Sequence, residues 1–492
     1  MTTKLVVIGG GIAGLSAGVY ARKCGFDVTI LESHNIAGGN CTSWRRGGYL
    51  FEGGMHWLSG SAKNNLNRLW RHVGALDDSV EIRYKEPFTE FDYDGIPVRF
   101  YRDVKLTQKH LLELSPADAK QIRKLCKWVK MIKGLQTPIK DLPGLETTKK
   151  FKNPLSSYLS ILSIISVFMQ VSKIKGEAYI NRFKSEAVRS LLKSVIIGDS
   201  GILPLVFTLG ALAGGDGGFP VGGSLPFTER IVKTFTDLGG KILYNTKATR
   251  VIMENNKVEG VMTGETKIPA DAVIIASDTM KIDNLFETPP KEKWFENMKA
   301  VTEPTMTTFI SLGINADLTK YHNYYYFKLK TPIKLADQTY DYLSFSNYSS
   351  DPIYSPTGKT AITIQLGGNT YDYWKNAKNE NNYTEKKQDL ANKVIEALTT
   401  KIPEITDKIE VIDVATPLTY ERYCDNWKGS WMTEMKSMKM ISYPCTIKDL
   451  NGVYLAGHRL LPPGGLPSAI ISARTAVQHL CRNTKTVFVG EE

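Results

Sequence analysis

The first forty residues constrain the fold of this chain more than any other segment. An apolar run at residues 5–8 leads into Gly9-x-Gly11-x-x-Gly14, and a helix of small residues separates this turn from a second apolar run that ends at Glu32. Gly9 makes the tight turn out of the strand, Gly11 lets a pyrophosphate approach the backbone, and Gly14 lets the helix pack closely on the sheet. The pattern predicts a βαβ unit that binds an ADP-containing dinucleotide, with phosphates at the helix N-terminus and ribose hydroxyls at Glu32.

Two further glycine pairs indicate which dinucleotide is bound. After Glu32 the chain reads Ser33-His-Asn-Ile-Ala-Gly38-Gly39-Asn40, and residues 51–57 read Phe-Glu-Gly-Gly-Met-His-Trp. This arrangement resembles FAD enzymes of the amine-oxidase and phytoene-desaturase superfamily, in which the second glycine pair lets the chain pass close to the cofactor. Residues 51–57 look most like the branch of retinol saturases and carotenoid isomerases. The resemblance implies FAD as the cofactor.

Two later segments resemble the second and third FAD-binding blocks of the same superfamily. They lie at residues 220–276 and 452–469. In relatives, the helix that starts near Leu466 aims its N-terminus at the flavin edge where reduced flavin is negative, and a helix N-terminus stabilises an anion. Carried over residue by residue, the resemblance implies cofactor contacts at Gly9, Gly11, Ile12, Ala13, Gly14, Glu32, Ser33, Gly38, Gly39, Asn40, Gly54, Met55, His56, Ala248, Gly457, Gly465, Leu466, Pro467 and Ala469.

The motifs also divide the chain, which at 492 residues is too long for one compact core. We expect an α/β fold (α+β overall), with a Rossmann-like FAD-binding domain, a β-sheet substrate domain and a helical insert. The FAD-binding domain is predicted from residues 1–75, 217–286 and 441–492, the substrate domain from 76–104 and 287–440, and the insert from 105–216. Strands of the substrate domain are predicted at 307–313, 324–329, 361–366 and 409–414.

The side chains expected on the substrate side are mostly aromatic. Trp57, Trp427 and Trp431 are predicted to line the substrate pocket. The run Tyr-Tyr-Tyr-Phe at 324–327 is a further candidate on this side, although an edge strand is the favoured prediction for it. An apolar tunnel suits a long unsaturated hydrocarbon, since each buried methylene contributes about 0.8 kcal/mol. His56 is the one titratable side chain that the resemblance places near the flavin. It is a candidate catalytic group for moving a proton, or else it only bonds the loop backbone.

The resemblance implies an FAD-dependent oxidoreductase that acts on carbon–carbon double bonds of an apolar polyene or unsaturated lipid, by saturation, desaturation or redox-neutral isomerisation. An amine-oxidase-type flavoenzyme is an alternative within the superfamily. A prenyl-lipid-binding escort protein, similar to dissociation inhibitors, is a non-enzymatic alternative. No second strand–Gly-rich turn–helix unit is found, so we expect no dedicated NAD(P)H domain, and the electron partner is not predicted.

Charge and residue composition indicate which kinds of partner the protein binds. The formal net charge is +12, but no nucleic-acid-binding module is found, so nucleic acid is not an expected partner. Residues 149–175 place lysines at both ends of an apolar, serine-containing stretch, which predicts an amphipathic helix that either packs over the substrate domain or lies on an anionic membrane surface. The cysteines and histidines lack metal-ligand spacing, so no metal is expected. Reduced cysteines and a first strand at Lys4 indicate a cytoplasmic protein, with a peripheral position on the inner membrane face as one option.

Overall fold

A five-stranded parallel sheet joins segments that are far apart in the sequence. Its order is β21-β13-β1-β2-β9, so that the N-terminal strand lies at the centre. The strands are β1 (Lys4–Ile8), β2 (Asp27–Leu31), β9 (Lys241–Leu243), β13 (Ala272–Ile275) and β21 (Val453–Leu455). This computed structural model describes residues 2–136, 138–196, 201–435 and 442–490, with the side chains of 156–161, 434 and 435 excepted. Residue 441, where the predicted third FAD segment begins, lies outside the described residues.

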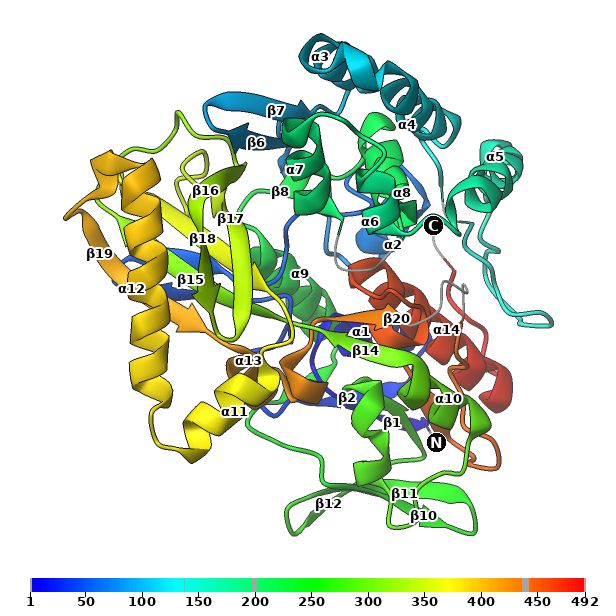
Figure 1. The fold of residues 1–492 in the computed structure, drawn as a ribbon. Coiled ribbons are helices and arrows are strands. Elements are labelled where there is room, and N and C mark those ends of the chain that lie inside the picture. The colour runs from blue at the N-terminus through cyan, green and yellow to red at the C-terminus, as the bar shows by residue number, and fades with distance from the viewer. Residues whose placement is uncertain (1, 137, 197–200, 436–441, 491–492) are drawn as a thin grey trace.

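Three helices pack beside one another on this sheet. They are α1 (Ile12–Lys23), α9 (Ser224–Asp237) and α14 (Leu466–Thr484), and α1 contacts the other two (Figure 1). Residues 12–21 of α1 are all buried, because the sheet and both helices surround them. Below the sheet in Figure 1 lies an antiparallel unit of β10 (Arg250–Glu254), β11 (Lys257–Thr263) and β12 (Thr266–Pro269).

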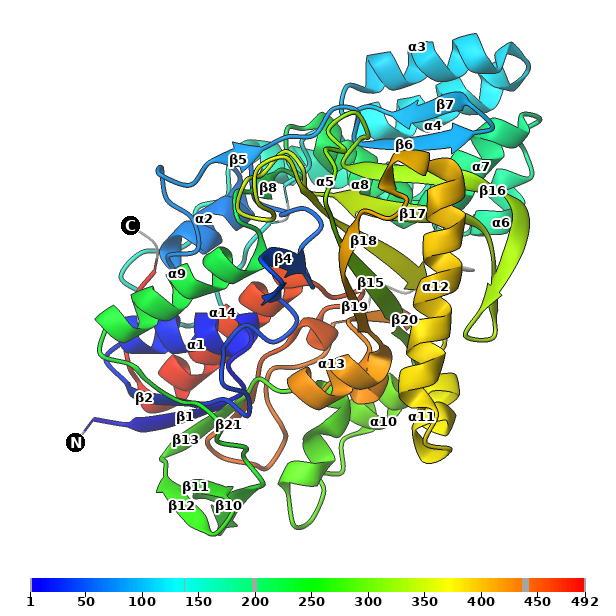
Figure 2. The same cartoon turned by 90° about the vertical axis from the view of Figure 1, so that its left-hand side faces the viewer.

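A seven-stranded sheet forms the second large body, in the order β19-β15-β18-β17-β16-β6-β7. Its strands are β6 (Thr89–Tyr93), β7 (Ile96–Phe100), β15 (Thr307–Ile314), β16 (Tyr324–Leu335), β17 (Gln338–Asn347), β18 (Thr360–Gly367) and β19 (Ile409–Ala415). The four predicted strands are thus confirmed. Helix α12 (Tyr383–Lys401) covers the outer face, where Leu390, Val394 and Leu398 join the core of the sheet (Figure 2).

The prediction of an edge strand at the tyrosine run is wrong. β16 pairs with β17 on one side and, in parallel, with β6 on the other, so it lies inside the sheet. The sequence did not reveal this neighbour because β6 comes from a segment more than 200 residues earlier. Alternate residues therefore face opposite sides, and Tyr325 and Phe327 enter the core beneath α12.

Helices of the central segment cover the other end of this sheet. They are α3 (Val104–Leu114), α4 (Ala119–Met131), α5 (Leu155–Val171), α6 (Gly176–Ile180), α7 (Glu186–Val195) and α8 (Leu203–Ala213). A short 3₁₀ turn, Pro116–Asp118, runs into α4. The predicted helix near 154–169 is α5. Within the described ranges, no helix has the length and apolar character needed to cross a membrane.

Short elements connect these bodies. They are α2 (Asn65–His72), α10 (Lys293–Val301), α11 (Tyr371–Asn379), α13 (Pro417–Cys424) and the strand pairs β3 (Ser43–Arg46) with β4 (Tyr49–Glu52), β5 (Ile82–Arg83) with β8 (Phe219–Pro220), and β14 (Thr302–Thr305) with β20 (Met432–Met435). The predicted fold class, a parallel Rossmann-like sheet with a second sheet and a helical part, is confirmed. The exact domain boundaries stay a prediction.

Candidate functional site

A single cavity of about 2360 Å³ extends from the glycine turn after β1 to the inner face of the seven-stranded sheet. Most residues predicted for the site line it, although they come from distant segments. These are Gly9, Gly11, Ile12, Ala13, Glu32, Ser33, Gly38, Gly39, Asn40, Gly54, Met55, His56, Trp57, Ala248, Trp431, Gly457, Gly465, Leu466, Pro467 and Ala469. Gly14 and Trp427 are not among the described residues that line it.

The glycine turn has the shape that a pyrophosphate requires. A Cβ added at Gly11 would have no protein atom nearer than 3.9 Å, so the space beside this residue opens to the cavity. Gly11 is also the N-cap of α1, with no side-chain cap and no acidic residue in the first turn. The free N–H groups and the positive end of the helix dipole are thus left for an anion. Gly14 instead contacts the strand, because its Cβ would lie 1.9 Å from the Gly9 carbonyl oxygen.

Glu32 lies at the end of β2 beside this turn. Its Oε2 accepts a hydrogen bond from the Gly10 backbone N–H at 2.8 Å, and its Oε1 accepts one from His34 N–H at 2.8 Å. Burial raises the pKa of this carboxyl, and the backbone donors partly oppose the shift. Each carboxylate oxygen retains capacity for a further hydrogen bond, which suits ribose hydroxyls.

Glu52 organises the second glycine pair, and the sequence analysis did not assign it a role. Its Oε1 accepts hydrogen bonds from the backbone N–H groups of Gly54 and Met55, each at 3.0 Å. Its Oε2 accepts from Ser224 N–H at 3.0 Å and from the Tyr354 hydroxyl at 3.1 Å, and the Ser224 hydroxyl donates to Oε1. The carboxylate thereby joins the loop after β4 to the first residue of α9. The only signal in the sequence was its position directly before Gly53-Gly54.

His56 lies on the cavity wall between two aromatic side chains. Its ring centroid is 6.3 Å from that of Trp57 and 6.2 Å from that of Trp431. Burial and, to a smaller extent, the charge of Lys85 lower the pKa of His56 to about 4, so the imidazole is neutral at pH 7. Its Nδ1 lies 3.3 Å from the Gln365 amide nitrogen. Because an amide NH₂ only donates, Nδ1 accepts and the proton is on Nε2.

A buried ion pair fixes the wall near Trp427. Arg459 donates two hydrogen bonds of 2.8 Å to the Asp278 carboxylate, and both side chains are at most 2% exposed. Burial raises the pKa of Asp278, but the charge of Arg459 outweighs it and the net shift is downward. Trp427 lies beside this pair: its backbone N–H donates to Asp278 Oδ2 at 2.8 Å, and the centroid of its ring is 5.8 Å from the guanidinium carbon of Arg459. Its predicted place in the substrate pocket is therefore not where its side chain lies.

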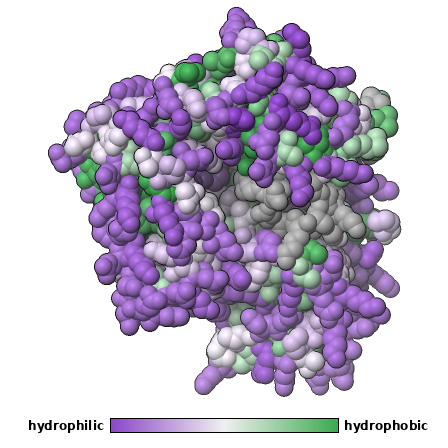
Figure 3. Space-filling model, viewed as in Figure 1, coloured by the Kyte–Doolittle hydropathy of each residue, from purple (hydrophilic) through white to green (hydrophobic). Residues whose placement is uncertain are grey.

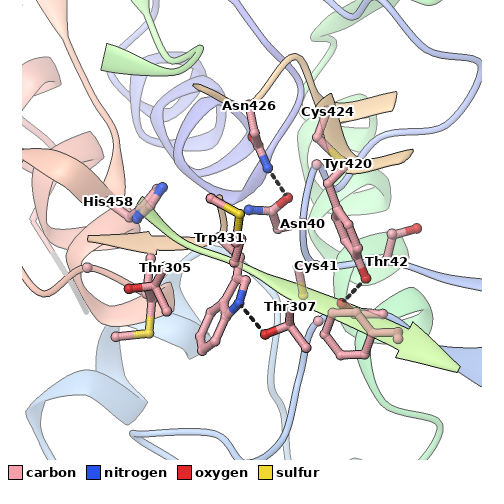
Figure 4. A pocket seen from close by; sticks show the side chains of 18 of the residues that line it. Asn40, Cys41, Thr42, Thr305, Thr307, Tyr420, Cys424, Asn426, Trp431 and His458 are labelled. Carbon is pink, nitrogen blue, oxygen red and sulfur yellow. Dashed lines mark hydrogen bonds between the residues drawn. The ribbon is translucent and has the colours of Figure 1, made fainter. Parts of the chain in front are cut away.

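Figure 4 shows the side chains around the middle of the cavity. The Asn426 amide donates to Asn40 Oδ1 at 2.6 Å, and the Trp431 indole N–H donates to the Thr307 hydroxyl at 3.1 Å. The Tyr420 hydroxyl donates to the Gly53 carbonyl oxygen at 3.0 Å. These bonds attach the segment before β20 to Asn40 beside the first glycine pair and to β15, and they attach α13 to the second glycine pair.

The far end of the cavity is an aromatic and apolar chamber, defined by Trp57, Phe88, Tyr324, Tyr326, Tyr342, Leu205 and Leu209. The rings of Trp57 and Phe88 are 5.5 Å apart, and those of Phe88 and Tyr324 are 5.9 Å apart. The leucines come from α8 in the helical part. The chamber is thus bounded by the sheet on one side and by α8 on the other.

A second helix N-terminus also opens into the cavity. Gly465 is the N-cap of α14, with no side-chain cap and no acidic residue in the first turn. His458, which precedes this helix and also lines the cavity, is neutral because burial lowers its pKa to about 3. Two uncapped helix N-termini and an open glycine cradle fit FAD, whose phosphates and reduced flavin are both anionic.

Comparisons with known proteins agree with this geometry. Prolycopene isomerase 2 of an Oncidium hybrid cultivar is 23% identical, over 95% of this chain and 82% of that protein. The all-trans-retinol 13,14-reductase of Danio rerio is 24% identical, over 85% of this chain and 75% of that protein. An oxidoreductase from Methanosarcina mazei has a similar fold, with a TM-score of 0.61 at 18% identity, over 96% of this chain and 100% of that one. The family of flavin containing amine oxidoreductases matches residues 12–481. The chain belongs to this family and is an enzyme with FAD as its cofactor.

Proposed function

We propose that this flavoenzyme acts on carbon–carbon double bonds of an apolar polyene or unsaturated lipid, by saturation, desaturation or isomerisation. The observation that carries the proposal is the continuity of one cavity from the cofactor cradle to the chamber between α8 and the second sheet. A long apolar chain fits such a chamber because burial of its methylenes supplies affinity without ion pairs. The named activities of the prolycopene isomerase and retinol reductase relatives support the same substrate class.

The proposed cofactor contacts follow from the lining residues. The N–H groups of α1 after Gly11 would hold the pyrophosphate, Glu32 would hold the ribose, and the loop of Gly54 and Met55 would hold the flavin. The N-terminus of α14 at Gly465 would stabilise negative charge on the flavin. FAD when bound supplies acceptance or donation of a hydride. The chain orients the substrate and excludes water around it.

His56 is the proposed proton carrier. The imidazole is neutral at pH 7 and its protonated Nε2 is a donor, because Gln365 occupies Nδ1. A neutral imidazole placed beside Trp57 and Trp431 holds a proton within the chamber without leaving a buried charge. Replacement of His56 by Phe should keep the flavin and lower turnover about 100-fold, the lower end of the usual contribution of general acid–base groups. Full activity with bound flavin would remove this role.

An anaerobic half-reaction tests the substrate class. The purified yellow protein is photoreduced, retinol, carotenoids and unsaturated fatty acids are added in turn, and the oxidised-flavin band is followed. Return of the band with one of them shows hydride transfer to carbon. A bleached band together with a shifted double bond on chromatography shows an isomerase. If only oxygen restores the band and amines bleach it again, the enzyme is an amine oxidase and the proposal is wrong.

Peripheral contact with an anionic membrane is also proposed, through α5. Leu155, Leu162 and Met169 are 72%, 70% and 68% exposed, and hydrophobic atoms show at the surface over this helix (Figure 3). The lysines that flank the helix, Lys149, Lys150, Lys152, Lys173 and Lys175, are exposed. An exposed apolar stripe with basic flanks is the arrangement that inserts into a headgroup layer. The side chains of Ser156, Leu159 and Ser160, which belong to the predicted amphipathic helix, are not described.

Co-sedimentation with anionic liposomes tests this contact. The wild-type protein should pellet at low salt and less so at high salt, and Leu162→Glu with Met169→Glu should abolish pelleting. Leu106→Glu on α3 is the control, since Leu106 also has exposed lysines beside it but is not part of an exposed apolar stripe. No pelleting of the wild type at low salt would contradict the proposal.

A further inference from the structure

Two tyrosine hydroxyls in the chamber have no hydrogen-bond partner among the described residues. Tyr326 on β16 and Tyr342 on β17 line the cavity, and their ring centroids are 6.1 Å apart. Tyr326 pairs with Ser344 of β17, and Tyr342 lies two residues before Ser344 on that strand. The two tyrosine rings are therefore diagonal neighbours on one face of the sheet. Both side chains are half-buried against the helical core.

The other tyrosines of this part of the sheet do use their hydroxyls. Tyr324 donates to the His56 carbonyl oxygen, Tyr325 donates to Asp92 at 2.7 Å, and Tyr340 donates to the Gly367 carbonyl oxygen at 3.0 Å. Tyr326 and Tyr342 differ from these three because both line the cavity and their hydroxyls bond no other described residue. Phenylalanine would give the same rings without the polar atoms.

A pure hydrocarbon in the chamber would leave these hydroxyls unsatisfied. On the opposite wall Leu205 and Leu209 offer no acceptor, and the hydroxyl residues that also line this side, Ser194 and Thr208, bond neither tyrosine. A hydrocarbon that fills the space displaces water from each hydroxyl and returns no hydrogen bond, which is unfavourable for binding. Burial raises the pKa of Tyr326 to about 12 and that of Tyr342 above its usual value, so both are neutral donors.

We infer that the chamber takes a long apolar substrate that carries an oxygen function, and that this oxygen accepts hydrogen bonds from Tyr326 and Tyr342. An alcohol, a carbonyl or a carboxylate shares the required acceptor. The inference rests on the proposed function for the apolar part of the substrate and adds the polar group that two donors recognise. Tyr326 and Tyr342 would then select an oxygenated lipid over the hydrocarbon of the same skeleton.

Binding to the oxidised holoenzyme without turnover tests the inference. The probes are all-trans-retinol, retinoic acid and the deoxy hydrocarbon of retinol, and the readout is quenching of tryptophan fluorescence. The wild type should bind retinol, retinoic acid or both more tightly than the hydrocarbon. Tyr326→Phe and Tyr342→Phe should each raise the Kd of the preferred oxygenated probe about 3- to 10-fold, as expected for one hydrogen bond. The Kd of the hydrocarbon should stay the same or fall.

Tyr325→Phe is the matched control, because Tyr325 is the next residue on β16 but its hydroxyl bonds Asp92 on the other face. It should leave the ratio of oxygenated-probe to hydrocarbon Kd unchanged. If both tyrosine variants also leave this ratio unchanged while the probes bind, the inference is wrong and the proposed function stands. If no probe binds and none reacts with reduced flavin, both the inference and the proposed function are wrong. Preference for alcohol over carboxylate, or the reverse, names the oxygen function.

Discussion

At the scale of single residues, Glu52 determines the shape of the loop beside the proposed flavin position. Five hydrogen bonds end on its carboxylate, and the side chain is 2% exposed. Glu52→Ala should lower the free energy of unfolding by about 3 kcal/mol or more, because several buried donors lose their only acceptor. Urea denaturation of the purified variant measures this loss, and the flavin absorbance of the folded fraction reports whether the loop still holds FAD.

Glu52→Gln separates loss of the acceptor from loss of the charge. The amide oxygen still accepts, but its NH₂ faces donors such as the Ser224 N–H. We expect a smaller loss of stability than in Glu52→Ala. Equal stability of wild type and Glu52→Ala would show that the network contributes nothing.

The buried ion pair of Arg459 and Asp278 allows a second prediction about the free energy of unfolding. Arg459→Leu leaves the Asp278 carboxylate buried with only backbone donors at Met280 and Trp427. Removal of one partner from a buried ion pair costs about 3–5 kcal/mol. The same denaturation experiment should show a loss in this range, and the double variant Asp278→Asn with Arg459→Leu should recover part of it. A loss below about 1 kcal/mol for Arg459→Leu would contradict the assigned role of the pair.

At the scale of elements, two substitutions in the turn between β1 and α1 distinguish loss of FAD binding from loss of folding. Gly11→Ala adds a Cβ that meets no protein atom within 3.9 Å, so the apoprotein should fold with stability within about 1 kcal/mol of wild type. The same Cβ occupies the space of the pyrophosphate, and FAD affinity should fall at least about 10-fold. Gly14→Ala places its Cβ 1.9 Å from the Gly9 carbonyl oxygen and should disrupt the packing of α1 on the sheet.

Circular dichroism and titration with FAD distinguish these two outcomes. Gly11→Ala should retain the wild-type spectrum and bind FAD weakly, whereas Gly14→Ala should lose helical signal or fail to fold. A Gly11→Ala protein with unchanged FAD affinity would show that the cofactor does not approach this turn.

The same elements show what the sequence could predict. The glycine spacing predicted β1, α1 and β2, because both the turn and the helix packing require residues without a Cβ at fixed positions. The position of β16 inside the sheet was missed, because pairing with β6 is a long-range contact with no local signature. The sequence likewise predicted Trp427 in the pocket, but its ring lies beside Arg459 of the buried ion pair, and it is not among the described residues that line the cavity. Glu52 was missed because burial and partner geometry decide its role.

At the scale of the whole molecule, three segments of the chain have to come together before the cavity exists. β1, β13 and β21 are consecutive neighbours in one sheet although more than 440 residues separate the first from the last. Assembly also buries histidines from different segments: His56, His72 and His458 have pKa values lowered to about 4, 3 and 3, with burial as the main cause. The stability of the whole molecule should therefore depend on pH.

The sign of this dependence follows from proton binding. The unfolded chain binds protons on these histidines below about pH 6.5, whereas the folded protein does not until about pH 4 or lower. Their contribution to stability is complete above pH 6.5 and is lost as the pH falls. Burial raises the pKa values of Glu32 and Glu52, and these two carboxyls act in the opposite direction. A single histidine is consequently a sharper test than the total slope.

His72 is the histidine to replace, since it is not one of the described residues that line the cavity and FAD binding does not affect its protonation directly. In the wild type, His72 should remove about 2 kcal/mol of stability between pH 6.5 and pH 5, because each pH unit between the two pKa values is worth about 1.4 kcal/mol. His72→Gln does not titrate, so its stability relative to wild type should improve by that amount on acidification. Urea denaturation of both proteins at pH 7 and pH 5 measures the difference, and a constant difference would show that His72 is protonated equally in the folded and unfolded states.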